Sequence, residues 1–252
     1  MLSINQLSVN FGGIKAVNNA TMKIEKSKIT GLIGPNGAGK TTLFNIIAGN
    51  VTPTNGSVFL DEKNITGLQS HELFNEGVLR TFQLAHEFSN MTVLENLMVV
   101  PGSQSGESIF NTWFKRKIIE KEESIIREKA IEVINFLKLD HLMFELAGNL
   151  SGGQKKLLEL GRSIINGPKI LLLDEPLAGV NPKLAEEILT IIQKLSQEGI
   201  TIIMVEHNIE AVMKISERVI VLAEGSVIAD GNPEKVRKDP KVIEAYLGSG
   251  NE

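Results

Sequence analysis

Residues 34–41 carry the side chains and the spacing needed to bind a polyphosphate. The segment from Gly34 to Thr41 reads Gly-Pro-Asn-Gly-Ala-Gly-Lys-Thr and fits the pattern G-x-x-x-x-G-K-[ST]. The apolar run Ile29–Ile33 before it predicts a buried strand, and Thr42–Ala48 after it predicts a helix. Glycines let a backbone approach phosphates, and the N–H groups at a helix N-terminus attract anions. This setting favours a phosphate-binding loop over the alternative, an ordinary glycine-rich turn.

Two side chains of this loop are expected to have separate tasks. Lys40 is expected to reach the β- and γ-phosphates, and the Thr41 hydroxyl is expected to bind Mg²⁺. A dinucleotide-binding loop is disfavoured, because the third glycine of G-x-G-x-x-G is missing. The residues predicted to contact the nucleotide in this loop are Gly34, Pro35, Asn36, Gly37, Ala38, Gly39, Lys40, Thr41 and Thr42.

A pair of carboxylates forms the second candidate for chemistry. Asp174 and Glu175 follow the apolar run Ile170–Leu173, which predicts a buried strand. Ligands of open α/β sheets bind outside the carboxyl ends of the strands. We therefore expect Asp174 to share Mg²⁺ with Thr41, and Glu175 to orient or deprotonate a water for in-line attack on the γ-phosphate. A solvated turn or a helix cap is the alternative interpretation of such a pair.

The segment Leu150–Gln154 reads Leu-Ser-Gly-Gly-Gln and precedes an apolar helical pattern that stops at Asn166-Gly167-Pro168. Ser151 and Gln154 have the spacing of a capping box, which is the structural interpretation. The same Gly-Gly helix start, with a hydroxyl before it and Lys155-Lys156 after it, also suits an anion. Two anion-binding helix termini for one nucleotide indicate a dimer in which each subunit supplies one terminus.

Composition narrows the function classes. The 252 residues are 42% hydrophobic and 22% charged, with a net charge of −4 and no cysteine. This is the balance of a globular protein without a basic footprint for nucleic acid, without disulfides and without thiol chemistry. The N-terminal residues lack a secretion signal, and the apolar runs are too short to span a membrane, so any membrane role is expected to be peripheral.

The pattern of elements predicts an α/β fold interrupted by a mainly helical section. Strands are predicted within residues 2–11, 20–24 and 57–60, and a helix is predicted over Ser70–Leu79. Arg80–Gln83 is predicted to be strand-like, and the helical pattern runs from Thr112 to Leu146. Later predictions are a helix over Asn181–Leu195 with Asn181 as N-cap, strands over residues 200–205, 219–222 and 227–229, and two helical segments at the end. His207 follows one of these strands, where a structural histidine is the more ordinary case.

Taken together, these segments resemble the ATP-binding cassette (ABC) ATPases of ABC transporters over essentially the whole chain. The resemblance rests on the order and spacing of five segments: Gly34–Thr41, Gln83, Leu150–Gln154, Ile170–Glu175 and His207. It implies a P-loop NTPase of the ABC type, with a mixed sheet core, an N-terminal antiparallel β part and a helical subdomain. The implied division gives residues 1–84 and 164–252 to the core and residues 85–163 to the subdomain that carries Leu150–Gln154.

The resemblance also implies a role for each motif. Gly34–Thr41 looks like Walker A, Asp174 like the Walker B ligand of Mg²⁺, and Glu175 like the catalytic glutamate. Gln83 looks like the glutamine that touches Mg²⁺ and the attacking water, and His207 like the histidine on the γ-phosphate. The segment Ser151, Gly152, Gly153 and Gln154 looks like the signature motif of the family, which closes over the partner's ATP. Phe11 lies where the family has the aromatic residue that stacks on adenine. Phe11 also fits an apolar strand face.

One position departs from the common family pattern. Asn181 stands where many cassettes have aspartate, which weakens any claim about that contact across a dimer. Several stretches resemble the branched-chain amino acid importer branch, among them Arg80–Gln83, Gly179–Pro182 and Glu206–Asn208. ATPases of urea import and of lipopolysaccharide export are close to that branch and stay as alternatives.

The resemblance implies an ATPase subunit at the cytoplasmic face of the cell membrane that energises uptake of branched-chain or other polar amino acids. Its implied partners are a second, identical or related cassette, two transmembrane permease subunits and, indirectly, an external solute-binding protein. The region from Gln83 to Val100 and the helical section are the expected permease-facing surface. A soluble ABC ATPase acting on nucleic acid or ribosomes is disfavoured by the acidic charge and by the absence of coiled coils or a second cassette. A small-molecule kinase leaves Ser151–Gln154 and His207 unexplained.

Overall fold

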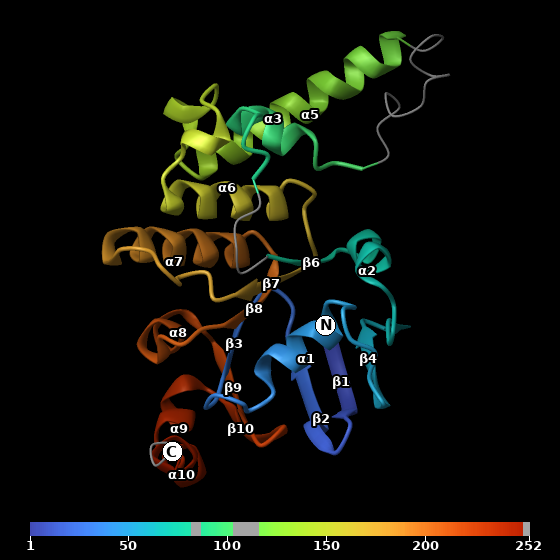
Figure 1. Cartoon of the computed structure of the whole chain (residues 1–252), viewed down its shortest axis with the longest axis vertical. Coiled ribbons are helices and arrows are strands. Elements are labelled where there is room, and N and C mark those ends of the chain that lie inside the picture. The colour runs from blue at the N-terminus through green and yellow to red at the C-terminus, as the bar shows by residue number, and fades with distance from the viewer. Residues whose placement is uncertain (82–86, 103–115, 249–252) are drawn as a thin grey trace. The chain divides into compact units, whose positions relative to one another are not determined.

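The computed structural model describes residues 1–81, 87–102 and 116–248, and Figure 1 shows the arrangement of its elements. The chain divides into two compact units. The first comprises Met1–Arg80, Lys169–Ala178 and Glu186–Glu252, and the second comprises Thr81–Pro168 and Gly179–Ala185.

A four-stranded antiparallel sheet occupies the N-terminal part of the first unit, as the alternating pattern predicts. Its strand order is β2-β1-β4-β5. The strands are β1 (Leu2–Phe11), β2 (Ile14–Ile24), β4 (Asn55–Leu60) and β5 (Lys63–Asn64). The register of β1 against both neighbours shifts after Ile4 and Asn5, where Gln6 adopts a left-handed conformation with φ 48°. This irregularity lets Leu2, Ile4, Leu7 and Val9 all remain buried on one strand.

The second sheet of this unit has six strands in the order β10-β9-β3-β8-β7-β6. Strands β9, β3, β8, β7 and β6 are parallel, and β10 pairs antiparallel with β9 through a hairpin at Glu224-Gly225. Every residue of β3, β7 and β8 is buried, as expected for central strands covered on both faces. The strands are β3 (Ile29–Ile33), β6 (Val78–Arg80), β7 (Ile170–Asp174), β8 (Thr201–Val205), β9 (Arg218–Ala223) and β10 (Ser226–Gly231). The predicted mixed sheet with an antiparallel N-terminal part is confirmed.

Among the described residues, six helices belong wholly or mainly to the first unit. They are α1 (Lys40–Ile47), α2 (Ser70–Glu76), α7 (Pro182–Gln197), α8 (Ile209–Ile215), α9 (Pro233–Arg237) and α10 (Pro240–Gly248). Helix α7 starts as predicted, with Oδ1 of the N-cap Asn181 accepting the N–H of Leu184 at 2.9 Å. The N-terminal residues of α7, up to Ala185, belong to the second unit.

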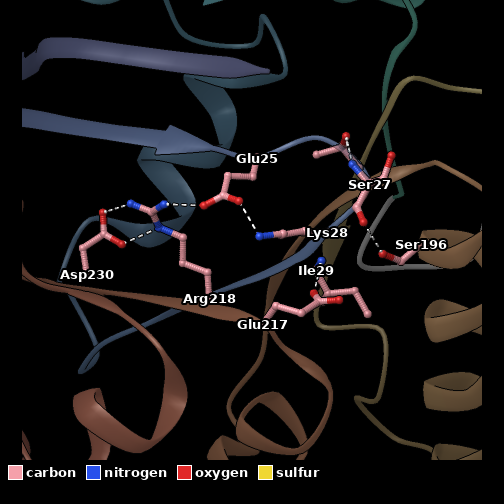
Figure 2. Close-up of polar contacts among 9 residues, drawn as sticks. Glu25, Ser27, Lys28, Ile29, Ser196, Glu217, Arg218 and Asp230 are labelled. Atoms are coloured by element: carbon pink, nitrogen blue, oxygen red, sulfur yellow. Dashed lines mark hydrogen bonds and ion pairs between the residues drawn. The ribbon is translucent and has the colours of Figure 1, made fainter.

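Polar contacts fix the start of β3, the strand that leads into the phosphate loop (Figure 2). The backbone N–H of Ile29 donates to Oε2 of Glu217 at 2.6 Å, and the Ser196 hydroxyl donates to the carbonyl of Ser27 at 3.2 Å. The Arg218 guanidinium donates to both carboxylate oxygens of Asp230, at 2.6 and 2.8 Å. These contacts fix the position of β3, and the phosphate loop follows the other end of this strand.

The second unit is helical among its described residues. It contains α3 (Val93–Met98), α5 (Arg116–Phe136), the short 3₁₀ turns η2 (Asp140–Leu142) and η3 (Ala147–Asn149), and α6 (Gly152–Ile164). Gly161 lets α6 pack closely, since a Cβ there would lie 2.7 Å from Leu137 and 3.2 Å from Leu97. Thr92 and Glu95 form a capping box at the start of α3.

Three predicted elements are wrong in their limits. Helix α2 ends at Glu76 instead of Leu79, because Gly77 is left-handed with φ 88° and Val78 begins strand β6. The strand predicted over Arg80–Gln83 includes only Arg80 among the described residues.

The helix predicted through Leu146 is the third. It ends at Phe136, and Lys138 takes a left-handed conformation with φ 58°. Across the ranges that the structure describes, no helix is both long and apolar enough to span a membrane.

Candidate nucleotide site

The phosphate loop joins β3 to α1, as predicted, and two of its glycines are required by the backbone. Gly34 has φ 153°, and a Cβ there would lie 2.1 Å from the carbonyl oxygen of Leu222 on β9. Gly39 has φ 93°, and a Cβ there would lie 2.3 Å from the carbonyl oxygen of Ala16 on β2. Backbone carbonyls from both sheets of the first unit therefore lie close to the loop and restrict its conformation.

Helix α1 begins at Lys40, two residues earlier than predicted, with Gly39 as N-cap. No side chain among the described residues caps this N-terminus. Thr41 is exposed in the first turn, while Thr42 is half-buried. The first N–H groups of a helix lack partners within it, so this terminus has the electrostatic character of an anion site.

The Lys40 side chain folds back over the loop. Its Nζ donates to the carbonyl oxygens of Gly34 at 2.7 Å and Pro35 at 2.9 Å, and the residue is 7% exposed. Burial lowers the pKa of the Lys40 ammonium, and the negative charge of Glu175 acts in the opposite direction. This effect of Glu175 on Lys40 indicates that the residue after β7 lies near the loop.

Asp174 is the last residue of β7 and is 6% exposed. Its Oδ2 accepts a hydrogen bond from Nη2 of Arg80, the last residue of the neighbouring strand β6, at 2.5 Å. Buried carboxylates need such partners, because an unpaired charge inside a protein is strongly disfavoured. A motif indicates this carboxylate in the sequence, but no motif indicates Arg80 as its partner.

Glu175 follows in a left-handed conformation with φ 49°, which is uncommon for a residue with a side chain. Its N–H donates to the carbonyl of Val205 on β8, and its Oε1 lies 3.0 Å from Nε2 of His207. The Glu175 side chain is 20% exposed and that of His207 is 60% exposed. The structure therefore brings these two predicted site residues together at the carboxyl ends of neighbouring strands.

Glu206 is a site residue that was not predicted from the sequence. It is 5% exposed, and its two carboxylate oxygens accept the N–H of Leu177 at 2.6 Å and its own neighbour's N–H, that of His207, at 3.1 Å. One buried carboxylate thus connects the turn after Glu175 to the turn that carries His207. Its place directly before His207 was the available signal, but its other partner, Leu177, is remote in sequence.

A small cavity of about 210 Å³ lies beside the phosphate loop. Its lining comes from the loop (Gly34, Pro35, Asn36), from the end of β8 and the start of α8 (Glu206, His207, Ile209) and from Tyr246 on α10. Burial raises the pKa of the Tyr246 hydroxyl, and a hydrogen bond with the backbone of Gly34 acts in the opposite direction. The C-terminal helix therefore reaches the first glycine of the loop, which no motif in the sequence indicated.

The Ser151–Gln154 segment lies in the second unit and forms the N-terminus of α6. The capping box is present: Oγ of Ser151 accepts the N–H of Gln154 at 3.4 Å, and Oε1 of Gln154 accepts the N–H of Ser151 at 2.8 Å. Gly152 has open space around its Cα, whereas a Cβ on Gly153 would lie 2.1 Å from Leu184 of α7. Lys155 forms an ion pair with Glu87 at 2.7 Å.

Phe11 ends β1 with 52% of its surface exposed, so it does not belong to the buried face of the strand. Its ring is therefore accessible for stacking with a base. Gln83 lies outside the described residues.

The metal prediction depends on the donor set. In the described parts of the chain, no group of three or more His, Asp or Glu side chains is arranged to hold a metal ion. One carboxylate from Asp174 and one hydroxyl from Thr41 instead fit Mg²⁺, which keeps several waters and is bound together with substrate phosphates.

Comparisons with known proteins agree with this geometry. A sequence description of the ABC transporter family matches residues 17–178, and one described as "Branched-chain amino acid ATP-binding cassette transporter" matches residues 226–251. The chain is 44% identical over 249 residues to the "Probable branched-chain amino acid transport ATP-binding protein LivG" of Archaeoglobus fulgidus, covering 99% of this chain and 96% of the relative. It is 39% identical to the "High-affinity branched-chain amino acid transport ATP-binding protein BraF" of Pseudomonas aeruginosa, covering 98% of both.

Solved structures give the same result. The ADP conformation of an ATP-binding cassette of an ABC transporter matches with a TM-score of 0.84 and 40% identity over 98% of both chains. A nucleotide-free cassette matches with a TM-score of 0.83 and 40% identity over the same share of each chain. The predicted P-loop fold of the ABC type and the predicted ATPase activity are confirmed. The chain therefore belongs to the ABC transporter family, as one of its ATP-binding cassettes.

Proposed function

We propose that this cassette energises the uptake of branched-chain or other polar amino acids through a separate permease. Two observations support the amino-acid substrate: the names of the relatives that match over the whole chain, and the match of residues 226–251 to the branched-chain cassette description. Binding of ATP is supported by the uncapped N-terminus of α1 and by the Lys40 ammonium beside it. The domain organisation we propose is a single ABC ATPase, with residues 1–84 and 164–252 as core and residues 85–163 as helical subdomain.

The contact between Glu175 and His207 is the observation that carries the proposed mechanism. Glu175 accepts a proton from a water that attacks the γ-phosphate, and His207 orients the Glu175 carboxylate at 3.0 Å and senses the γ-phosphate. Lys40 holds the β- and γ-phosphates, and the loop N–H groups from Gly34 to Thr42 surround them. Thr41, Asp174 and Gln83 are the proposed Mg²⁺ ligands, and Phe11 the adenine platform. When bound, Mg²⁺ neutralises phosphate charge.

A second cassette completes the proposed site. Ser151, Gly152, Gly153 and Gln154 start a helix whose N-terminus is exposed at Ser151 and Gly152, which suits an ATP bound to a partner subunit. Closure of such a dimer requires that ATP bind the closed state more tightly than the open one. Hydrolysis at Glu175 then returns the pair to the open state.

Exposed apolar side chains in the second unit support docking to a transmembrane permease. Phe88, Met91 and Leu146 are 45%, 37% and 44% exposed. They lie on two segments that are joined by backbone hydrogen bonds, from Ala147 to Met91 at 2.9 Å and from Gly148 to Ser89 at 3.0 Å. Neighbouring apolar side chains of this kind mark interaction surfaces. We place the cassette, docked in this way, at the cytoplasmic face of the membrane, with a solute-binding protein as an indirect partner outside.

Glu175→Gln tests this function in the reconstituted transporter. The amide cannot accept the proton, so we expect ATP binding to persist, steady-state hydrolysis to fall by roughly 10²- to 10⁴-fold, and an ATP-dependent dimer to accumulate. Hydrolysis is measured as phosphate release, dimers by size-exclusion chromatography, and transport as uptake of labelled leucine against labelled urea.

Glu186→Gln is the matched control, since Glu186 of α7 is exposed and pairs with Lys214 of α8. It is expected to keep wild-type hydrolysis. Normal turnover by Glu175→Gln would contradict the catalytic role. Uptake of labelled urea but not of labelled leucine would contradict the proposed substrate class.

A further inference from the structure

Arg80 has a defined position beside the proposed metal ligand. It ends β6, a strand of three residues, and pairs in parallel register with Leu172 of β7. Its side chain reaches two residues further along β7, where Nη2 donates to Oδ2 of Asp174 at 2.5 Å. The side chains of Arg80 and Asp174 are 17% and 6% exposed, so the ion pair is largely withdrawn from solvent.

The guanidinium has a second contact on the helix that follows the phosphate loop. Nη1 of Arg80 donates to Oδ1 of Asn45 on α1 at 2.5 Å. Its Nε is buried and has no hydrogen-bond partner among the described residues. The guanidinium is thus held at its two terminal nitrogens, in a fork that connects α1 to the end of β7. Arginine suits this task because its donors are planar and its charge is permanent.

We propose that Arg80 is a positioning residue that serves as the internal counterion of Asp174 while no metal is bound, and that it thereby sets how strongly nucleotide affinity depends on Mg²⁺. This inference rests on the proposed role of Asp174 as a Mg²⁺ ligand. It assigns Arg80 no contact with the nucleotide.

The direction of the effect follows from two electrostatic terms. Arg80 already occupies one oxygen of the carboxylate, so an arriving cation shares that carboxylate with the guanidinium. The permanent positive charge also repels Mg²⁺, and it does so in a site where screening by water is weak. Both terms weaken metal binding in the wild type. Without Arg80, the buried carboxylate has lost its guanidinium partner, and Mg²⁺ gains more by binding there.

Arg80→Gln tests the proposal in the full chain, because glutamine keeps a hydrogen-bond donor and removes the charge. The dissociation constant of ADP is measured by calorimetry with saturating Mg²⁺ and again with EDTA, and the ratio of the two values is the readout. We expect the Mg²⁺-dependent gain in ADP affinity to increase by about tenfold over the wild type. The thermal midpoint without ligand should fall, and Mg²⁺-ADP should raise it more than in the wild type.

Arg218→Gln is the matched control. Arg218 also forms a forked pair with a carboxylate, Asp230, but at the base of β3 (Figure 2). Its loss should lower the thermal midpoint while the Mg²⁺ ratio stays within about twofold of the wild type. A purely structural role of Arg80 predicts the same behaviour for both variants.

An unchanged or smaller Mg²⁺ ratio in Arg80→Gln overturns the proposal. If that variant does not fold, Arg80→Lys takes its place. One ammonium cannot hold Asp174 and Asn45 in the same fork, so the ratio should shift in the same direction by about threefold, and no shift overturns the proposal. A wild-type protein whose ADP affinity ignores Mg²⁺ is a different result, because it overturns the metal role of Asp174 itself.

Discussion

Two glycine-rich helix N-termini in this chain are built in opposite ways. At α1 the N-cap is Gly39, no described side chain caps the helix, and the conformation is imposed by backbone carbonyls that approach Gly34 and Gly39. At α6 the helix caps itself, because Ser151 and Gln154 exchange hydrogen bonds across the first turn.

The difference indicates which terminus is a complete anion site within one chain. The α1 terminus has a buried ammonium next to it and leaves its N–H groups to the ligand, so it is organised to hold a polyphosphate alone. The α6 terminus satisfies the N–H groups of Ser151 and Gln154 through its own side chains and presents an exposed hydroxyl and Gly152, so its first turn is stable without a ligand. A terminus of the second kind suits the partner side of a shared site, since it has to exist before the partner arrives.

The largest effect is expected when one glycine of each helix N-terminus is replaced by alanine. Gly39→Ala forces a side chain into φ 93° and against the carbonyl of Ala16, so we expect a loss of roughly 2–5 kcal/mol in the free energy of unfolding and loss of ATP binding. Gly152→Ala meets no atom within 4 Å and should change stability by less than about 1 kcal/mol. Urea denaturation and ATP titration measure both variants. Equal stability of the two would show that the loop backbone is not fixed by its neighbours.

The cap of α6 gives a smaller effect. Ser151→Ala removes the acceptor for the N–H of Gln154, so the free energy of unfolding should fall by about 1 kcal/mol. ATP binding by one subunit should persist, because the loop at α1 is unchanged, while dimer-dependent hydrolysis should fall.

Asn232→Ala is the matched control for this cap. Asn232 caps α9 by accepting the N–H of Glu234 at 2.8 Å. It should lower stability by a similar amount and leave hydrolysis unchanged. If both variants reduced hydrolysis equally, the loss of hydrolysis would be explained by lower stability and not by a role of Ser151 in the signature motif.

Both termini could be predicted from the sequence because their determinants are local. The pattern G-x-x-x-x-G-K-[ST] lies between a strand and a helix, and the capping box needs only residues three apart. The limits of α2 were wrong because Val78 and Leu79 continue a helical pattern equally well, although Gly77 was an available stop signal. The end of α5 at Phe136 carried no glycine or proline signal at all.

The contacts that surround the site could not be predicted in the same way. Arg80 and Asp174 are separated by 94 positions, and Glu206 binds the N–H of Leu177 across 29 positions. Such pairs depend on the strand order β8-β7-β6, which no local pattern determines. Motifs therefore identified the residues expected to touch the nucleotide, while the residues that position them required the fold.

The smallest effect concerns another self-capped helix, α3, whose capping carboxylate titrates. Oε2 of Glu95 accepts the N–H of Thr92 at 2.7 Å, and this backbone hydrogen bond, followed by the one from the Thr92 hydroxyl, lowers the pKa of Glu95 below its usual 4.5. A lowered carboxyl pKa stabilises the fold fully above 4.5, and that contribution disappears as the pH falls through the lowered value. The box at α6 has the neutral Gln154 in the equivalent position and contributes no such pH dependence.

Glu95→Gln converts the α3 box into the α6 type and so isolates the charge. The urea midpoint of the wild type should exceed that of the variant at neutral pH, because the ionised carboxylate accepts more strongly than an amide. The gap should narrow as the pH is lowered through 4.5. Other carboxyl groups titrate in both proteins and cancel in the difference. A gap that stays constant with pH would mean that geometry alone, and not charge, makes a self-capped terminus stable, and the contrast between α1 and α6 would then rest on hydrogen bonding without electrostatics.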